Sequence, residues 1–441
     1  MTVLPEEFSR YTRQLMGDGR YERFVSALEQ PSVVSIRTNS LKFPHPQPQL
    51  KCVPWCHDAY YLQERPNFTF DPLLHAGYYY VQEASSMFID QVLRQYVHHP
   101  AVMLDMCAAP GGKSTAAISA LPEGSMLVSN EPIRTRSQIL AENIQKWGYA
   151  DCMVTNCYPK DYHKSGAMFD VILCDVPCSG EGMFRKDEGA IQEWSAQHVA
   201  QCTQLQRDIV TEAWHCLRDG GLMIYSTCTF NAHEDEENVA WLMEQTGAEI
   251  LTVNTEEDWH ITGSLLPQFQ HPVYRFIPGY TQGEGLFMAV LRNPGKATDN
   301  GTPADTKRTR ELINKKLRPI YNGIPAPTQK GKDLIPAQAA ALSPSFLTAM
   351  RQQHREYPMA EVNYQQAMQY LRHEAITLPA DTPRGIVLIC FQYAPLGFAK
   401  NIGNRANNLY PQEWKIKSSH VPTEYEPIIR PTYHDFPEDL R

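Results

Sequence analysis

The chain of 441 residues has no apolar run that approaches the roughly 20 residues needed to cross a bilayer. It also lacks a basic start followed by an apolar stretch, so no signal peptide is indicated. The 11 cysteines are scattered and odd in number, which argues against a disulfide framework in a chain of this size. We therefore expect a soluble, cytoplasmic protein with reduced thiols and no membrane contact.

Basic residues are also in the minority. The net charge of -9 excludes a surface that is basic throughout, but it permits a local groove that binds phosphate. The apolar fraction of 42% and the aromatic fraction of 10% are typical of a folded protein. The length is too great for one ordinary core and predicts two or three domains.

From about Ala101, short apolar runs alternate with helical patterns. Strands are expected at AVMLDM, SMLVSN, CMVTN, FDVILCD and GLMIYS, and helices at STAAISAL, RTRSQILAENIQKWG and TQLQRDIVTEAWHCL. Buried strands that alternate with amphipathic helices predict a doubly wound, mostly parallel α/β sheet of Rossmann-like type.

The regions on either side of this sheet have different patterns. Residues 1–95 are helical at first and then contain short strands, and they form an N-terminal segment beside the α/β domain of residues 96–293. A polar stretch rich in Gly, Pro and Thr predicts a linker at 294–325. Residues 326–430, with the clear strand GIVLICF, predict a small α+β domain, followed by a tail at 431–441.

Both common phosphate-binding patterns are missing from the loop after the first predicted strand, CAAPGGKS. A P-loop needs glycine where Cys107 stands, and the dinucleotide pattern G-x-G-x-x-G is absent. Small residues at the start of a helix still let backbone N–H groups approach a ligand closely. The loop therefore favours a cofactor without a phosphate chain, or a tight turn with no ligand.

Glu131 ends the second predicted strand, roughly twenty residues after this loop. An acidic side chain at that place typically accepts hydrogen bonds from ribose hydroxyls, although a glutamate there can also be a helix cap or a solvated charge. A ribose-binding acid without a pyrophosphate cradle indicates S-adenosylmethionine as the cofactor.

Two cysteines follow predicted strands. DVPCSG, with Asp175 and Cys178, is similar to the loop of amino-group methyltransferases, but Cys178 stands where those enzymes have an aromatic. A thiolate can add to carbon 6 of a pyrimidine and make carbon 5 nucleophilic. Asp175, if protonated or sharing a proton with ring nitrogen 3, would stabilise the charge on the ring. Cys228 in YSTCTF has a similar position, so the residues alone leave open which thiol attacks.

Three motifs together, CAAPGGK, DVPCSGEGMFRKD and YSTCTFNAHEDEENV, resemble the Sun/Nop family of RNA cytosine-5 methyltransferases. SIRTNSLK, HAGYYYVQEASSM and RFIPGYTQGEGLFMAVLR resemble the same family outside the catalytic core. Residues 395–416 resemble the PUA-like domain of its bacterial members of RsmF type, which act on small-subunit ribosomal RNA. The resemblance implies an S-adenosylmethionine-dependent enzyme that methylates 16S ribosomal RNA, with transfer RNA as the alternative substrate.

The resemblance also assigns residues. It places cofactor contacts at Cys107, Ala108, Ala109, Pro110, Gly111, Gly112, Lys113, Glu131 and Asp175. Lys113 would orient the base or tune the cysteines, because a nearby ammonium lowers the pKa of a thiol. The chain departs from the family at Tyr158, where a carboxylate usually contacts the cofactor, and Asn156, Asp161 or water are the possible substitutes.

The family resemblance separates the two thiols. It implies that Cys228 is the nucleophile that attacks carbon 6 and that Cys178 assists product release. The alternative for either residue is a buried apolar thiol with no chemical role. The target cytosine must be turned out of its stack into the pocket, at a cost of a few kcal/mol.

Other candidates carry less chemistry. Cys52 and Cys56 beside His57 lack a second ligand pair, so we expect no metal site. Tyr78, Tyr79 and Tyr80 either stack on bases or pack in the core. Basic residues that suit phosphate contacts are Lys400, Arg405 and those of KRTRELINKKLR.

Two other kinds of function compete with the favoured one. An RNA-binding assembly factor without catalysis is compatible with Tyr158 but not with two intact cysteine motifs. A methyltransferase for exocyclic amines or protein glutamine is disfavoured by Cys178 in place of the aromatic. We expect RNA or the small ribosomal subunit as the partner, and a monomer.

Overall fold

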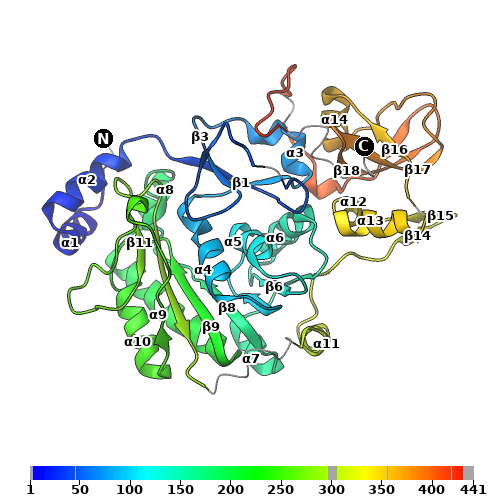
Figure 1. Cartoon of the computed structure of the whole chain (residues 1–441). Coiled ribbons are helices and arrows are strands. Elements are labelled where there is room, and N and C mark those ends of the chain that lie inside the picture. The colour runs from blue at the N-terminus through cyan, green and yellow to red at the C-terminus, as the bar shows by residue number, and fades with distance from the viewer. Residues whose placement is uncertain (1–2, 45, 296–304, 355, 419, 431–441) are drawn as a thin grey trace.

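The computed structural model describes residues 3–44, 46–295, 305–354, 356–418 and 420–430 (Figure 1). The predicted tail, 431–441, lies outside the described residues. Within the predicted linker, 294–325, residues 296–304 also lie outside them, and the rest contains helix α11 (Thr306–Lys316) and strand β13 (Tyr321–Asn322). No helix in the described ranges is long and apolar enough to cross a membrane.

A nine-stranded sheet forms the centre of the protein. Its five parallel strands lie in the order β9-β8-β5-β6-β7. They are β5 (Val102–Asp105), β6 (Met126–Asn130), β7 (Cys152–Thr155), β8 (Phe169–Asp175) and β9 (Leu217–Thr227). The antiparallel strands are β12 (Leu286–Arg292) on β9, β10 (Glu249–Ile250) and β11 (Tyr274–Phe276) on β12, and β13 on β7. The predicted mostly parallel α/β sheet is confirmed.

Helices cover both faces of the sheet, because successive strand side chains point to opposite sides. Met103 of β5 belongs to one apolar cluster, and its neighbours Val102 and Leu104 belong to another. The first face is covered by α4 (Ile89–Tyr96), α5 (Gly112–Ala120) and α6 (Arg134–Trp147). The second is covered by α7 (Pro159–Ser165), α9 (Ala196–Trp214), α10 (Glu236–Thr246) and α11.

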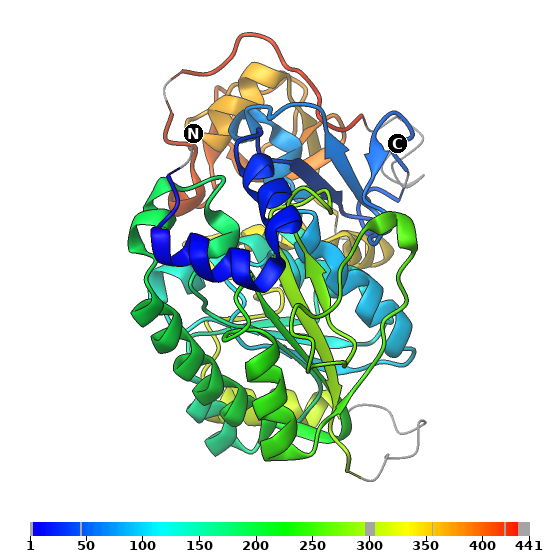
Figure 2. The ribbon, with the colours of Figure 1, turned by 90° about the vertical axis from the view of Figure 1, so that its left-hand side faces the viewer.

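The N-terminal segment has two parts. Helices α1 (Glu6–Met16) and α2 (Asp18–Leu28) break at Gly17, whose φ of 77° favours glycine. They bury Phe8 and Phe24 in an aromatic cluster with residues that follow β8 and β9, and Figure 2 views them from outside. The second part is an antiparallel sheet, β2-β3-β1-β4, with helix α3 (Pro72–His75). Its strands are β1 (Val34–Thr38), β2 (Lys51–Cys52), β3 (Ala59–Leu62) and β4 (Tyr79–Val81).

The C-terminal domain is a four-stranded sheet with three helices and a hairpin. Its strands are β16 (Met359–Glu361), β17 (Gly385–Phe391), β18 (Ala394–Asn401) and β19 (Ala406–Asn408). The helices are α12 (Gln338–Ala341), α13 (Pro344–Gln352) and α14 (Tyr364–Leu371), and the hairpin pairs β14 (Thr328–Lys330) with β15 (Asp333–Ile335).

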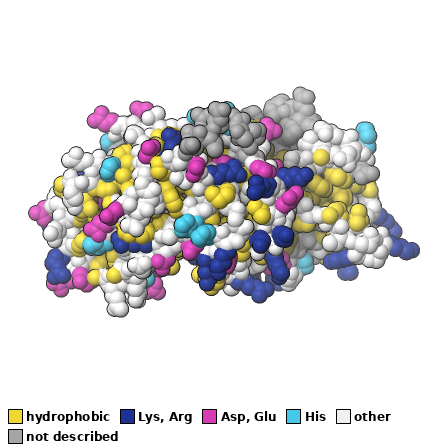
Figure 3. All heavy atoms as spheres, turned by 90° about the horizontal axis from the view of Figure 1, so that it is seen from below, with side chains coloured by type: hydrophobic (Ala, Val, Ile, Leu, Met, Phe, Trp, Pro, Cys, Tyr) yellow, Lys and Arg dark blue, Asp and Glu magenta, His cyan; other side chains and the backbone are white. Residues whose placement is uncertain are grey.

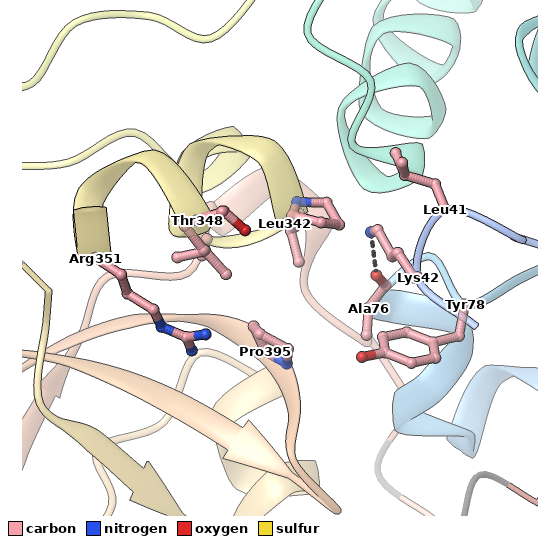
Figure 4. A pocket seen from close by; sticks show the side chains of 11 residues that line it. Leu41, Lys42, Ala76, Tyr78, Leu342, Thr348, Arg351 and Pro395 are labelled. Atoms are coloured by element: carbon pink, nitrogen blue, oxygen red, sulfur yellow. Dashed lines mark hydrogen bonds between the residues drawn. The ribbon is translucent and has the colours of Figure 1, made fainter. Parts of the chain in front are cut away.

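The C-terminal domain and the N-terminal sheet share one apolar core, which contains Ile36 and Tyr79 from one side and Leu371 and Ile389 from the other. Figure 4 shows a small cavity of about 50 Å³ at this junction, between Leu41, Lys42 and Tyr78 of the N-terminal segment and Leu342, Thr348, Arg351 and Pro395 of the C-terminal domain. The buried Lys42 Nζ donates to Ala76 O and to Lys146 O, both at 2.6 Å. One side chain thus joins the ends of α3 and α6.

Candidate active site

A cavity of about 600 Å³ opens at the carboxyl ends of β5, β8 and β9. Ligands of open α/β sheets bind at this edge. Residues from six parts of the chain line it, among them Tyr80, Gln82, Glu83, Asp105, Cys107, Ala108, Ala109, Pro110, Gly112, Lys113, Arg136, Asp175, Met183, Lys186, Cys228 and Gly285. The cavity therefore includes most of the residues that the sequence predicted for the site.

The loop between β5 and α5 forms the floor of the cavity. Gly111 has a φ of 114°, and a Cβ there would lie 3.2 Å from Leu140 Cδ1, so the turn needs glycine. Helix α5 begins at Gly112, and the first N–H groups of a helix have no partner within it. These groups and the small side chains of the loop suit a compact ligand that approaches the backbone.

Asp105, at the end of β5, was missed by the sequence analysis, although it stands two residues before Cys107. It is fully buried, and Oδ2 accepts a hydrogen bond from Ser114 Oγ at 2.7 Å, while Oδ1 has no partner among the described residues. Burial raises the pKa of Asp105 to about 7. An unpaired buried carboxylate oxygen at the wall of a cavity suits a positively charged ligand group.

Glu131 is buried but does not line the cavity. Its Oε1 accepts the N–H of Ile133 at 2.9 Å, and Oε2 lies 3.4 Å from Nη1 of Arg136. Arg136 lines the cavity and also donates to Ala109 O at 3.0 Å. The Arg136 guanidinium therefore contacts both Glu131 and the loop of small residues.

Tyr158 faces away from the cavity, with 62% of the residue exposed. Neither Asn156 nor Asp161, the two possible substitutes for the missing carboxylate, lines the cavity. Each side chain makes a hydrogen bond with the backbone instead. Asn156 Nδ2 donates to Glu131 O at 2.7 Å, and Asp161 Oδ2 accepts the N–H of Tyr158 at 3.0 Å. The position where the family usually has a carboxylate is therefore turned to solvent.

The two cysteines of the predicted site meet. Because β8 and β9 are neighbours, the loops that follow them lie side by side, and the sulfurs of Cys178 and Cys228 are 3.1 Å apart. The hydrogen bond with Cys228, together with burial, raises the pKa of Cys178 well above its ordinary value. Cys178 is thus held as a thiol in hydrogen-bond contact with the Cys228 sulfur, and either sulfur can be the donor.

Lys113 and Asp175 form an ion pair beside the thiols, with Nζ 2.9 Å from Oδ2. Ser226 Oγ donates to Asp175 Oδ1 at 2.7 Å and fixes the carboxylate. Burial alone would lower the pKa of Lys113, but Asp175 and the nearby Cys228 outweigh it, and the pKa is raised. A stable cation therefore lies near the Cys228 sulfur.

Two buried glutamates hold the cysteine loops together, and the sequence analysis singled out neither, although both lie in the quoted motifs. Glu181 accepts four hydrogen bonds: from Phe230 N (2.7 Å), Asn231 N (3.1 Å), Asn231 Nδ2 (3.0 Å) and Trp194 Nε1 (2.9 Å). Glu234 accepts from Ser179 N (3.0 Å), Ser179 Oγ, Asn231 Nδ2 (2.8 Å) and Gln206 Nε2 (2.6 Å). The loop of Cys178 is thereby joined to the loop of Cys228 on both sides.

The N-terminal segment supplies one wall of the site. The buried Arg37 of β1 donates to Gln82 Oε1 at 3.0 Å and to Thr115 Oγ1 of α5 at 2.6 Å, and its guanidinium lies 4.5 Å from the Trp147 ring centre. Gln82 lines the cavity. These contacts fix β4 against α5, the helix that carries Lys113. The local sequence around these residues does not indicate that the two segments meet.

The weaker candidates separate clearly. Tyr78 and Tyr79 are buried in the core, whereas Tyr80 lines the cavity. Cys52 is exposed and Cys56 is buried, and the described ranges contain no group of three or more potential metal ligands. In the C-terminal domain Lys400 pairs with Asp333, and Arg405 is exposed in the turn between β18 and β19.

A Rossmann-like sheet with a cavity at the carboxyl ends of its parallel strands is the architecture of a methyltransferase domain. Comparison with known proteins agrees. The family described as 16S rRNA methyltransferase RsmB/F matches residues 94–292, the N-terminal domain of 16S rRNA methyltransferase RsmF matches 4–84, and the methyltransferase RsmF PUA domain matches 358–416.

Curated relatives extend the match to nearly the whole chain. Ribosomal RNA small subunit methyltransferase F of Salmonella heidelberg is 30% identical over 472 residues, covering 93% of this chain and 96% of the relative. The protein of the same name from Salmonella agona is 31% identical over 470 residues, with the same coverage. The chain belongs to the ribosomal RNA small subunit methyltransferase F family.

Solved structures share the fold. A methyltransferase homolog protein from Pyrococcus horikoshii has a TM-score of 0.56 at 24% identity and covers 66% of this chain and 95% of its own. NSun6 from Pyrococcus horikoshii, solved with SFG, has a TM-score of 0.56 at 19% identity and covers 67% of this chain and 100% of its own.

Proposed function

We propose that the protein transfers a methyl group from S-adenosylmethionine to carbon 5 of a cytosine in small-subunit ribosomal RNA. The observation that carries the proposal is the pair of sulfurs of Cys178 and Cys228, 3.1 Å apart, beside the Lys113–Asp175 ion pair. Carbon 5 of a pyrimidine needs a thiolate at carbon 6 before it can attack, and a second acid or base to complete the reaction.

The cavity fits the cofactor. S-adenosylmethionine supplies the methyl group and carries an ammonium group, which suits the unpaired Oδ1 of Asp105. The loop from Cys107 to Lys113 offers backbone N–H groups and little side-chain bulk. Glu131, which Arg136 contacts, would hold the ribose hydroxyls.

Cys228 is the nucleophile in this proposal. Cys228 lines the cavity near the Lys113 ammonium, so its sulfur can reach carbon 6 of a base that enters the cavity. Asp175 is fixed by Ser226 and Lys113, so a base that meets its carboxylate is held in one orientation.

Cys178 completes the reaction. Its raised pKa keeps the thiol protonated until the adduct has formed. Once the Cys228 sulfur is bonded to carbon 6, its contact with the Cys178 thiol is broken, and the Cys178 thiol gives its proton to solvent. The Cys178 thiolate then takes the proton from carbon 5 while the bond between carbon 6 and Cys228 breaks, which leaves Cys178 as a thiol and Cys228 as a thiolate.

Ribosomal RNA is the proposed substrate because the resemblance to small-subunit methyltransferases covers 93% of this chain. The C-terminal domain, whose residues 358–416 match the RsmF PUA domain, is the proposed reader of RNA shape around the target. This substrate places the enzyme in the cytoplasm, where the small subunit is assembled.

The test uses purified protein, S-adenosylmethionine and unmodified RNA, with bisulfite mapping of new 5-methylcytosines and denaturing gels for RNA adducts. Cys228→Ala should abolish both methylation and the adduct, because no thiolate adds to carbon 6. Cys178→Ala should accumulate an adduct that releases slowly. The exposed Cys52 provides a matched control, and Cys52→Ala should behave as wild type.

Three results would contradict the proposal. The absence of new 5-methylcytosine in any RNA would contradict the proposed activity. New sites confined to transfer RNA would contradict ribosomal RNA as the substrate. An adduct that persists in Cys228→Ala and disappears in Cys178→Ala would exchange the roles of the two thiols.

A further inference from the structure

Tyr158 lies next to a group of cations that come from two distant parts of the chain. Helix α7 begins directly after Tyr158, and α11 packs beside α7, with Tyr162 and Ile313 in the same apolar cluster. Cys157 Sγ lies 3.4 Å from Leu317 O, so the residues that flank Cys157 and Leu317 are neighbours in space. Six of the exposed basic residues of this region are Lys160, Lys164, Arg308, Lys315, Lys316 and Arg318.

We propose that Tyr158 and these six cations, here called the Tyr158 surface, bind RNA next to the target base. The cations would contact phosphates, and the Tyr158 ring would stack on an unpaired base. The inference rests on the proposed RNA substrate and adds a contact region outside the cavity and outside the C-terminal domain.

The charges of the Tyr158 surface are available to a partner. Within the described ranges, none of its six cations is held in an ion pair, whereas Arg310 of the same helix is paired with Asp151 at 3.1 Å. Of the acids on the two helices, Asp161 is already used as the cap of α7, and Glu311 is exposed. Figure 3 views the molecule from the end where α7 and α11 lie, and Lys and Arg side chains gather in the middle of that face.

A cluster of this kind contrasts with the chain as a whole, whose net charge is -9. Because the protein as a whole is acidic, a polyanion is attracted to this local positive cluster and not to the protein surface in general. A Tyr ring that is 62% exposed, with the Lys160 ammonium 5.8 Å from its centre, adds the aromatic surface on which single-stranded bases stack.

The position is compatible with one RNA that occupies both the cavity and the Tyr158 surface. β7, which leads to Tyr158, is separated from β9, which leads to Cys228, by four strand intervals. At about 4.8 Å for each interval the two strand ends are roughly 19 Å apart. A stretch of a few nucleotides spans that distance when the target cytosine is turned into the cavity.

A membrane is the competing polyanion, and the packing of α11 disfavours it. Its main apolar residues, Ile313 and Leu317, are buried against the sheet at 0% and 7% exposure. A helix that lies in a lipid interface instead turns its apolar face outwards.

The experiment measures equilibrium binding of unmodified 16S ribosomal RNA and methyl transfer over a range of salt concentrations. Lys315→Gln/Lys316→Gln should weaken RNA binding roughly fivefold for each lost phosphate contact near 0.15 M salt, and it should reduce the salt slope by about 0.7 to 0.9 per contact. Tyr158→Ala should weaken binding roughly tenfold. In all these variants kcat at saturating RNA and the KM for S-adenosylmethionine should stay unchanged.

The matched control is Lys51→Gln/Arg65→Gln, which removes two exposed cations from the N-terminal segment and should have the smaller effect. The proposal is overturned if the two double variants bind RNA equally well. It is also overturned if Tyr158→Ala raises the KM for S-adenosylmethionine and leaves RNA binding intact. Binding to phosphatidylglycerol vesicles that is lost only in the α11 variant, with RNA binding kept, would assign the surface to membranes.

These outcomes are distinct from a failure of the proposed function. Wild-type protein that binds RNA through the Tyr158 surface but forms no 5-methylcytosine would contradict the activity and leave this binding surface supported. If the wild-type protein methylates RNA and neither Tyr158 nor α11 contributes to binding, the activity is supported and the Tyr158 surface is contradicted.

Discussion

Replacing Glu181 with glutamine tests whether the buried glutamates position the two thiols. Glu181 is 1% exposed and uses both oxygens, each of which accepts two hydrogen bonds. Glutamine keeps one oxygen and replaces the other with NH₂, so two of the four donors lose their acceptor whichever way the amide is turned. Each unpaired buried donor costs about 1–3 kcal/mol.

Part of that cost is offset, because the variant no longer buries a carboxylate. Burial, together with the neighbouring Glu234, raises the pKa of Glu181, so the charge itself is unfavourable in this place. We expect Glu181→Gln to reduce the free energy of unfolding by about 2 to 4 kcal/mol. This loss should be measured by urea denaturation at neutral pH.

The kinetic effect should be local to the thiols. In either orientation of the amide, Asn231, three residues after Cys228, loses an acceptor, and the Cys228 carbonyl already accepts Gly182 N at 2.7 Å. A displacement of the order of 1 Å at reacting atoms costs about 100-fold in rate, so kcat should fall by roughly 10- to 100-fold. The KM for S-adenosylmethionine should not change, because Glu181 does not line the cavity.

The nearby exposed Glu188 provides the control, since Glu188→Gln changes the same groups without burial. Equal urea midpoints for the two variants, with a wild-type rate of adduct formation in Glu181→Gln, would refute the reasoning. A rise in the KM for S-adenosylmethionine at an unchanged single-turnover rate would also refute the reasoning. Such a result would mean that Glu181 supports cofactor binding and not the position of the thiols.

Two further changes test the support of the site. Asp105 has a pKa of about 7 when folded and about 3.9 when unfolded, so its contribution to stability is complete below about pH 4 and is lost as the pH rises through 7. In the wild type, this ionisation should lower the free energy of unfolding by up to about 4 kcal/mol between about pH 4 and pH 8, as measured by urea titration. Asp105→Asn should abolish this pH dependence and should weaken cofactor binding. A variant with the pH dependence of the wild type would contradict the prediction. Lys42→Met should cost about 2 kcal/mol in thermal unfolding, because Ala76 O and Lys146 O lose a buried donor, whereas substitution of the exposed Lys51 should be neutral.

Local patterns predicted the part of the site that depends on local order. Short apolar runs that alternate with helical patterns predicted parallel strands, and Cys178 and Cys228 were predicted to lie at the ligand-binding ends of two of them. That the two thiols meet depends on β8 and β9 being adjacent, which the structure supplies. Asp105 was available to the same reasoning, because it is the penultimate residue of the predicted strand AVMLDM and stands two residues before Cys107.

The walls of the site had no such local signal. Arg37 and Thr115 are 78 residues apart, and nothing in the pattern around either residue indicates that one side chain donates to the other. Glu131 illustrates a different limit, since a strand-end acid can be predicted from spacing, but its contact with the Arg136 guanidinium depends on how the next helix is turned.

The N-terminal helices pack against the segments that carry the two thiols. Phe8 of α1 packs against Phe184 and Trp194 at ring-centre distances of 5.0 and 5.4 Å, and Phe24 of α2 lies 4.9 Å from Phe230. These three partners belong to the segments that carry Glu181 and follow Cys228. Since the N-terminal sheet shares its core with the C-terminal domain, the matched methyltransferase region 94–292 has one side of its thiol site built by residues outside it. The thiols are therefore positioned by the N-terminal helices as well as by the catalytic sheet.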